Sequence, residues 1–183
     1  MFTAKMLRAC LLQSAILAAC VPLAAQAKSS TEQQGETLQL VIPAIALGAT
    51  LFYEEGYDGS LQFFESLATN ELTTYLLKQA IDARRPNGNC CNSFPSGHTS
   101  TAFMGAAFIH RRYGWEYAVP AYLGAAYVGY TRVDADKHYT RDVVAGAVIG
   151  IASSFYFTEP YEGVKITPYA ADGSYGIMFS GRW

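Results

Sequence analysis

Three long apolar segments without charged residues dominate the sequence, at residues 38–53, 117–130 and 143–157. Each is shorter than the roughly 20 residues that a helix needs to cross a bilayer. All three are rich in Gly, Ala and Tyr, as the buried helices of a bundle often are. The mean hydropathy of the whole chain is only +0.10. These features predict an all-α fold, built as a compact helical domain that lies outside the bilayer and can touch it.

Helix boundaries are indicated by capping residues and helix breakers. Asn70 is a suitable N-cap, Pro86 ends the helix that follows it, and Gly114 closes another helix. We therefore expect about six helices, at residues 38–53, 61–68, 70–84, 99–113, 115–130 and 138–157.

The last segment, residues 161–183, has a different pattern. Asp172-Gly173 lies between two short runs that are typical of strands, which predicts a short C-terminal β-hairpin. The chain ends in Trp183, and the last strand of an outer-membrane barrel also ends in an aromatic residue. One hairpin cannot close a barrel, so we expect this one to pack on the helical bundle.

The first 27 residues have the pattern of a secretory signal peptide. Lys5 and Arg8 precede an apolar core, and Ala25-Gln26-Ala27 is a small-x-small cleavage site. Residues 17–20 also resemble a lipobox, in which Cys20 would carry a lipid. We expect cleavage after Ala27 and export to the periplasm of a bacterial cell envelope, with a lipid anchor at Cys20 as the alternative.

Export leaves one domain of ordinary size. We expect a flexible lead-in at residues 28–37, a helical domain at 38–160 and the hairpin tail at 161–183. The formal net charge of −2 and the lack of basic blocks argue against nucleic acid as a partner.

The exported chain retains two adjacent cysteines, Cys90 and Cys91. A disulfide between neighbours is strained and uncommon, so free thiols and an intermolecular bond are the competing interpretations. No second Cys or His pair lies at ligand spacing, and we predict no zinc site.

One polar stretch, residues 131–142, contains a histidine and a carboxylate at helical spacing. If a helix begins near His138, then His138 and Asp142 share one of its faces, with Cβ atoms about 6 Å apart. The carboxylate can accept a hydrogen bond from one imidazole nitrogen and leave the other as a nucleophile or base. Arg132 adds a planar cation suited to an oxyanion. Taken alone, the stretch favours a surface histidine with an ion-pair partner.

Two further stretches contain groups that can bind an oxyanion. Lys78 and Arg85 are seven residues, or two helical turns, apart and project from nearly the same helix face. Ser96-Gly97-His98 precedes an apolar helix, whose first N–H groups can bind an oxyanion. Alone, these stretches could be a solvated basic stripe and a capped turn. Clustered with residues 131–142, they would form a pocket for a tetrahedral dianion, with the parts that phosphoryl transfer needs.

The three stretches resemble the motifs of the type-2 phosphatidic-acid phosphatase superfamily. Those motifs are Lys-x6-Arg-Pro, Pro-Ser-Gly-His and Ser-Arg-x5-His-x3-Asp. Here they are found, in order and at family spacing, at residues 78–86, 95–98 and 131–142. The one departure is Thr131, where the family usually has Ser, and it keeps a hydroxyl group. The resemblance covers roughly residues 38–157.

The resemblance implies a role for each matching residue. His138 would attack phosphorus and form a phosphohistidine, Asp142 would orient His138, and His98 would protonate the leaving oxygen. The phosphate oxygens would be held by Lys78, Arg85, Ser96, Gly97 and Arg132. For a phosphatase of this family, the resemblance implies neither a metal nor another cofactor, and its partner would be a phosphate-ester substrate, which can be a membrane lipid.

Several functions within this superfamily fit the sequence. We expect an exported phosphomonoesterase that acts on a lipid phosphate or pyrophosphate, with a broad-specificity soluble acid phosphatase as the alternative. A vanadium-dependent haloperoxidase is a more distant alternative, because known members of that branch are much larger. A binding module without catalysis is disfavoured, because every catalytic position is filled. The oligomeric state is left open.

Overall fold

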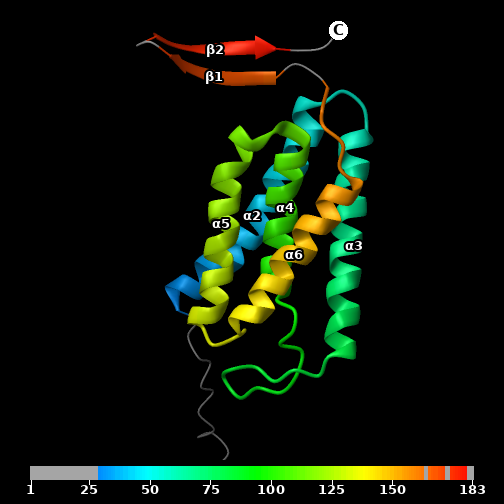
Figure 1. The fold of residues 1–183 in the computed structure, drawn as a ribbon, viewed down its shortest axis with the longest axis vertical. Coiled ribbons are helices and arrows are strands. Elements are labelled where there is room, and N and C mark those ends of the chain that lie inside the picture. Colours follow the sequence, from blue (N-terminus) through cyan, green and yellow to red (C-terminus); the bar gives the residue numbers. More distant parts are fainter. Residues whose placement is uncertain (1–28, 163–164, 172–173, 181–183) are drawn as a thin grey trace, which may run out of the picture.

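The computed structural model describes residues 29–162, 165–171 and 174–180, which form a helical bundle followed by two strands (Figure 1). The described elements are α2 (Ser30–Tyr53), α3 (Asp58–Ala80), α4 (Gly97–Tyr113), α5 (Trp115–Asp134), α6 (Thr140–Phe157), β1 (Lys165–Ala171) and β2 (Ser174–Ser180). The all-α class is confirmed for the bundle. The predicted signal peptide, its cleavage after Ala27 and the lipid on Cys20 lie outside the described residues and stay predictions.

Helix α4 is the centre of the bundle and packs against all four of the other described helices (Figure 1). Most of its residues are buried, and many of them are Ala, Gly, Ser or Thr. Met104 and Phe108 are fully buried in one apolar cluster, while Ala102 and Ala106 contribute to a second. Small side chains on α4 let its neighbours approach closely, since little volume separates the backbones.

Two glycines bring α6 against α4. A Cβ atom on Gly150 would overlap the carbonyl oxygen of Ser100 and lie 2.7 Å from the backbone nitrogen of Met104. A Cβ atom on Gly146 would lie 2.5 Å from the carbonyl oxygen of Ser96. The Gly146 contact holds α6 directly against the turn that begins α4, and that turn is part of the site described below.

We expect Gly150→Ala to destabilise the fold by about 1–3 kcal/mol or more, because the added methyl meets backbone atoms that cannot rotate away. Gly48 on α2 is a matched control, since a Cβ atom there meets nothing within 4 Å. Gly48→Ala should be neutral or stabilise the helix by about 0.5–1 kcal/mol. Denaturant unfolding of both variants makes the comparison, and equal free energies of unfolding would contradict this account of α4–α6 packing.

The predicted flexible lead-in is wrong for residues 30–37, which are helical. Ser29 caps α2, and its hydroxyl accepts a hydrogen bond from the backbone nitrogen of Glu32 at 3.1 Å. This cap satisfies one of the free N–H groups at the helix start, so the helix begins well before the apolar run. With these residues α2 reaches 24 residues, and by length and composition it could cross a membrane. It is the one such helix among the described residues, and it corrects the expectation that every apolar segment is too short to span a bilayer.

The predicted helices at 61–68 and 70–84 are instead one helix, α3, so the described residues hold five helices rather than six. Asn70 is fully buried in the middle of α3, and its side-chain nitrogen donates to Glu71 at 3.1 Å. It therefore does not act as an N-cap. The helix also ends earlier than expected, at Ala80, and residues 81–96 form a loop that returns to α4.

The two strands lie beyond one end of the bundle (Figure 1). They pair antiparallel, with Pro168 opposite Ile177 in the register. The predicted turn at Asp172-Gly173 falls outside the described residues.

A buried ion pair joins the elements at the end of the bundle far from the start of α4. Arg112 on α4 forms a salt bridge with Glu54, and their side chains are 7% and 2% exposed. The same guanidinium donates to the side chain of Gln62 at 3.2 Å and to the carbonyl oxygen of Glu159 at 3.0 Å. Tyr113 donates to Glu54 at 2.6 Å. This network ties α2, α3 and α4 to the segment that follows α6.

Candidate active site

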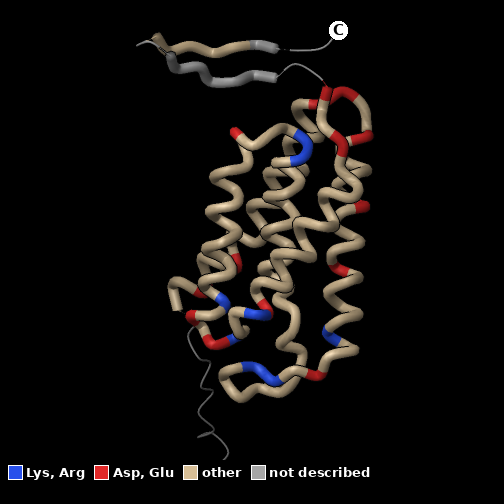
Figure 2. Tube along the Cα trace, viewed as in Figure 1, with Lys and Arg blue, Asp and Glu red and all other residues tan. Residues whose placement is uncertain are grey.

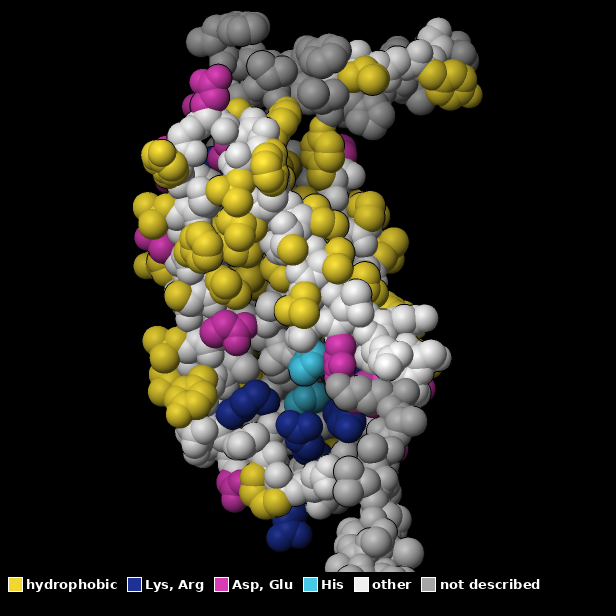
Figure 3. Space-filling view, turned by 180° about the vertical axis from the view of Figure 1, so that it is seen from behind, with side chains coloured by type: hydrophobic (Ala, Val, Ile, Leu, Met, Phe, Trp, Pro, Cys, Tyr) yellow, Lys and Arg dark blue, Asp and Glu magenta, His cyan; other side chains and the backbone are white. Residues whose placement is uncertain are grey.

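A cavity of about 350 Å³ opens near the end of the bundle where α4 begins. Lys and Arg residues gather at this end (Figure 2), and in the space-filling view they flank a hollow that contains histidine side chains (Figure 3). The lining residues come from four helices and two loops: Glu32, Glu36, Lys78, Arg85, Gly97, His98, Arg132, Lys137 and His138.

The three polar stretches of the sequence therefore meet in one place. Six of the eight predicted site residues line the cavity, namely Lys78, Arg85, Gly97, His98, Arg132 and His138. The other two, Ser96 and Asp142, are fully buried, and the backbone nitrogen of Ser96 donates to the carbonyl oxygen of Asp142 behind the cavity wall.

His138 is buried and its orientation is fixed by the loop before α4. Its Nδ1 lies 2.6 Å from the carbonyl oxygen of Ser93. A carbonyl oxygen only accepts, so in the neutral imidazole Nδ1 carries the proton and Nε2 has the free lone pair. The predicted partner, Asp142, has its Oδ2 3.7 Å from Nδ1, which is an ion-pair distance rather than a hydrogen bond.

Asp142 differs from its expected role because α6 begins at Thr140, after His138, and the two residues do not share a helix. The carboxylate instead caps α6, with Oδ2 accepting from the backbone nitrogen of Tyr139 at 3.0 Å. The same oxygen accepts from the hydroxyl of Ser93 at 2.6 Å. Asp142 therefore places a carboxylate beside His138 without accepting a hydrogen bond from it.

The surroundings of His138 favour its neutral form. Burial, followed by the positive charge of Lys78, lowers the pKa of His138 to about 4, although the Ser93 carbonyl and Asp142 act in the opposite direction. Nε2 therefore keeps its lone pair at mildly acidic and neutral pH. A neutral, oriented imidazole beside several cations is suited to attack an anionic phosphorus centre.

Lys78 holds the loop that returns to α4. Its Nζ donates to the carbonyl oxygens of Asn92 at 2.9 Å and Pro95 at 2.6 Å. Burial, followed by the charge of Arg85, lowers the pKa of Lys78 to about 8. Lys78 is therefore a cation at neutral pH. Its two hydrogen bonds also stabilise the loop that contains Arg85 and Ser93.

Arg132 is buried, and its guanidinium is already oriented. Nη2 donates to the carbonyl oxygen of Glu32 at 2.8 Å, and Nε donates to the hydroxyl of Thr131 at 3.2 Å. Glu36 lies 3.9 Å from Nη1. The threonine that replaces the family's usual serine thus uses its hydroxyl to position the arginine.

The turn before α4 is stabilised by hydrogen bonds to the start of α6 and within α4. The Ser96 backbone nitrogen donates to the carbonyl oxygen of Asp142 at 2.9 Å, and its side chain shares a hydrogen bond with Thr99 at 2.9 Å. Gly97 and His98 then form the first turn of α4 and line the cavity. The positive end of the α4 dipole, together with the cations on the cavity wall, makes the cavity suited to an oxyanion.

Sequence reasoning did not identify Ser93, Glu32 or Glu36 as parts of the site. The Ser29-x-x-Glu32 spacing was a usable signal for a helix start, since it matches a capping box. Glu32 and Glu36 place two carboxylates on the cavity wall, and Glu32 pairs with Lys137 at 3.5 Å. No sequence signal points to Ser93, because the atom that contacts His138 is a backbone oxygen.

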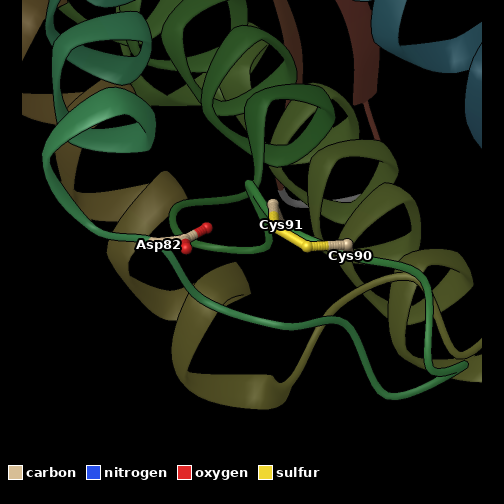
Figure 4. A group of neighbouring side chains, drawn as sticks. All are labelled: Asp82, Cys90 and Cys91. Carbon is tan, nitrogen blue, oxygen red and sulfur yellow. A yellow bond between two sulfur atoms is a disulfide. The ribbon is translucent and has the colours of Figure 1, made fainter.

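The adjacent cysteines are joined to each other in a disulfide, which settles the three alternatives for Cys90 and Cys91. Asp82 is close by (Figure 4), and these three side chains form the one group of potential metal ligands in the described part of the chain. Both sulfur atoms are used in the disulfide, so this group leaves one carboxylate rather than three ligands.

Residues 87–162 match the family model described as the PAP2 superfamily. The match spans less than half of the chain, and it shows that this part of the chain is similar to the PAP2 superfamily. The matched residues include the second and third motifs, whereas Lys78 and Arg85 precede them. The roles of the individual site residues stay predictions, supported by the geometry above.

The chain is also similar to two curated bacterial phosphatases. The chain is 41% identical to the lipid A 1-phosphatase of Porphyromonas gingivalis over 78 residues. This alignment covers 40% of this chain and 17% of that protein. It is 35% identical to the lipid A 4'-phosphatase of Helicobacter pylori over 111 residues. That alignment covers 55% of this chain and 54% of the relative. The chain thus spans about half or less of the length of these relatives.

The fold also resembles a solved structure. The crystal structure of Aquifex aeolicus LpxE aligns with a TM-score of 0.56 at 20% identity, over 68% of this chain and 83% of that one. This similarity supports the arrangement of the helices and says nothing about the substrate.

Proposed function

We propose that this protein is an exported, metal-independent phosphomonoesterase of the cell envelope, which acts on a lipid phosphate or pyrophosphate through a phosphohistidine at His138. The observation that carries the proposal is the 2.6 Å contact between His138 Nδ1 and the Ser93 carbonyl oxygen, in a cavity lined by Lys78, Arg85 and Arg132. It leaves Nε2 as an unprotonated nucleophile where phosphate oxygens would be held.

The reaction would proceed in two displacements. Nε2 of His138 forms a bond to phosphorus while the bond from phosphorus to the leaving oxygen breaks, and His98 gives that oxygen a proton. Water then attacks the phosphohistidine, His98 takes a proton from the water, and inorganic phosphate leaves with Nε2 restored. The carboxylate of Asp142, 3.7 Å from Nδ1, offsets the positive charge that the imidazole gains.

Two features support a lipid as the substrate. The named relatives act on lipid A, and the outer face of α2 beyond Glu36 carries exposed apolar side chains, including Leu40 and Ile45 at 64% and 59% exposure. Exposed apolar groups in a continuous run often mark contact with a lipid or a protein. Because Glu36 lines the cavity, this face begins at the rim of the site.

The test is phosphate release by the purified protein from a lipid phosphate, a lipid pyrophosphate and soluble sugar phosphates, with EDTA present and absent. We expect release from the lipids at a kcat/KM well above that for the soluble esters, and no effect of EDTA. Comparable rates on all esters would favour the broad-specificity acid phosphatase. Inhibition by EDTA that a divalent ion reverses would contradict the metal-free reaction.

The pH dependence of kcat/KM should follow the two shifted groups. Because the pKa of His138 is lowered to about 4, its neutral, nucleophilic form persists down to that pH. Because the pKa of Lys78 is lowered to about 8, its charge is lost above that pH and phosphate binding weakens. We expect kcat/KM to fall below about pH 4 and above about pH 8, because its pH dependence follows the pKa values of the free enzyme.

Lys78→Arg is the matched variant for the alkaline side, since a guanidinium stays charged throughout this range. The decline near pH 8 should move upward in this variant, whatever its overall activity. The substrate's own ionisation is common to both proteins and cancels in the comparison. An alkaline decline at the same pH in both would show that Lys78 is not its cause.

A further inference from the structure

Ser93 contacts the nucleophile and its neighbouring carboxylate at the same time. Its carbonyl oxygen lies 2.6 Å from Nδ1 of His138, and its hydroxyl donates to Oδ2 of Asp142 at 2.6 Å. The residue is fully buried. One residue thus fixes the distance between the imidazole and the carboxylate, which are 3.7 Å apart and do not hydrogen-bond to each other.

The position of Ser93 is itself fixed by the residues around it. Its backbone nitrogen donates to the carbonyl oxygen of Ala83 at 3.0 Å. Lys78 binds the carbonyl oxygens of Asn92 and Pro95, on either side of it. These contacts tie the Ser93 segment to the end of α3 and to the loop just after it, so the serine acts as a rigid support rather than a mobile loop residue.

The Ser93 contacts matter more as the reaction proceeds than while the substrate binds. The imidazole is neutral in the free enzyme and becomes cationic as Nε2 bonds to phosphorus. The Nδ1–H donor then strengthens its bond to the Ser93 carbonyl oxygen, and the Asp142 carboxylate becomes a favourable counter-charge. Neither contact touches the phosphate, so both stabilise the transition state over the bound substrate.

We infer that Ser93 is a positioning residue for the nucleophile, which holds the Asp142 carboxylate at its distance from His138 through its hydroxyl group. The inference rests on the proposed function, because it assigns Ser93 a part in the attack by His138.

The first experiment compares Ser93→Ala with the intact protein in steady-state hydrolysis. Loss of a hydrogen bond to a charged group should lower kcat about 10- to 100-fold. KM and the inhibition constant of vanadate should change by less than about 3-fold, because no contact with the phosphate is removed. An unchanged kcat, or a change confined to KM, would overturn the inference.

Ser154→Ala is the matched control for losing a buried serine hydroxyl. Ser154 on α6 is also fully buried, and its hydroxyl donates to the Met104 carbonyl oxygen at 2.7 Å, away from the cavity. The melting temperature of the Ser154→Ala variant should fall about as much as that of the Ser93→Ala variant, while its kcat should not change. If kcat falls equally in both variants, the role of Ser93 is structural and the inference fails.

A double-mutant cycle tests whether Ser93 acts through Asp142. In an Asp142→Asn background there is no carboxylate charge to hold, so adding Ser93→Ala should lower kcat by less than about 2-fold further. A full additional loss would overturn the inference. Failure of the proposed function is separable from this, since it would appear as a His138→Ala variant that retains activity.

Discussion

Replacing His138 with alanine should abolish turnover of every phosphate ester, whatever its leaving group. We expect kcat/KM to fall by about 10⁴-fold or more, as it does when an enzyme loses its nucleophile. The reason is that the first displacement needs Nε2 as its nucleophile, and a better leaving group does not replace a missing nucleophile. Measurements on a lipid phosphate and on p-nitrophenyl phosphate make the comparison.

His98→Ala should behave differently on the same two substrates, because it is expected only to protonate the leaving oxygen. General acid help is worth about 10²–10⁴-fold, and most of it is needed by a poor leaving group. The loss should therefore be larger on the lipid phosphate than on p-nitrophenyl phosphate, whose leaving group is already a stable anion. His98 lines the phosphate cavity, so some loss on both is expected.

His110 completes the set of three histidines and is the control. It lies near the far end of α4 and packs against Trp115 and Tyr122, so His110→Ala should keep near-normal kcat/KM on both substrates. If His98→Ala loses equally on both substrates while His138→Ala is the variant sensitive to the leaving group, the two roles are reversed.

Arg112→Met should be among the most destabilising substitutions in the chain, by about 3–5 kcal/mol. It leaves the Glu54 carboxylate, whose side chain is 2% exposed, as a buried charge without its guanidinium partner. The neighbouring Arg111 is exposed, and Arg111→Met should cost less than about 1 kcal/mol. Denaturant unfolding of the two variants provides the measurement.

Removing both charges tests the cause of this loss. The double variant Arg112→Met, Glu54→Leu should recover most of the lost stability, since no charge is then left unpaired. The folded fraction of each variant should keep its kcat, because Arg112 lies fifteen residues along α4 from Gly97 and the site. Stability that stays low in the double variant would show that shape, rather than charge, makes Arg112 important.

The sequence predicted which residues meet at the cavity better than it predicted how they are arranged. Lys78 and Arg85 were placed on one helix face, but α3 ends at Ala80 and Arg85 lies in the following loop. Both still line the cavity, because Lys78 folds that loop back by binding two of its carbonyl oxygens. Such contacts between backbone and distant side chains leave no periodic pattern in a sequence.

The partner of His138 could not be predicted for the same reason. The i to i+4 spacing of His138 and Asp142 indicated a direct hydrogen bond, but α6 begins after His138 and its start uses Asp142 as a cap. A backbone carbonyl, which any residue can supply, accepts the hydrogen bond from the imidazole instead. The helix start at Ser29 could have been predicted, because Ser29 and Glu32 have the spacing of a capping box. The polar composition of residues 30–37 instead favoured a flexible segment.

The measurement that tests the central claim most directly is the capture of the covalent intermediate. The purified protein would be mixed with a radiolabelled phosphate ester, quenched in alkali, digested and mapped by mass spectrometry, with His138→Ala as the control. Our account predicts a label that is stable in alkali and lost in acid, carried by the peptide that contains His138 and absent from the variant. Label on any other residue, or rapid turnover by the His138→Ala protein, would contradict it.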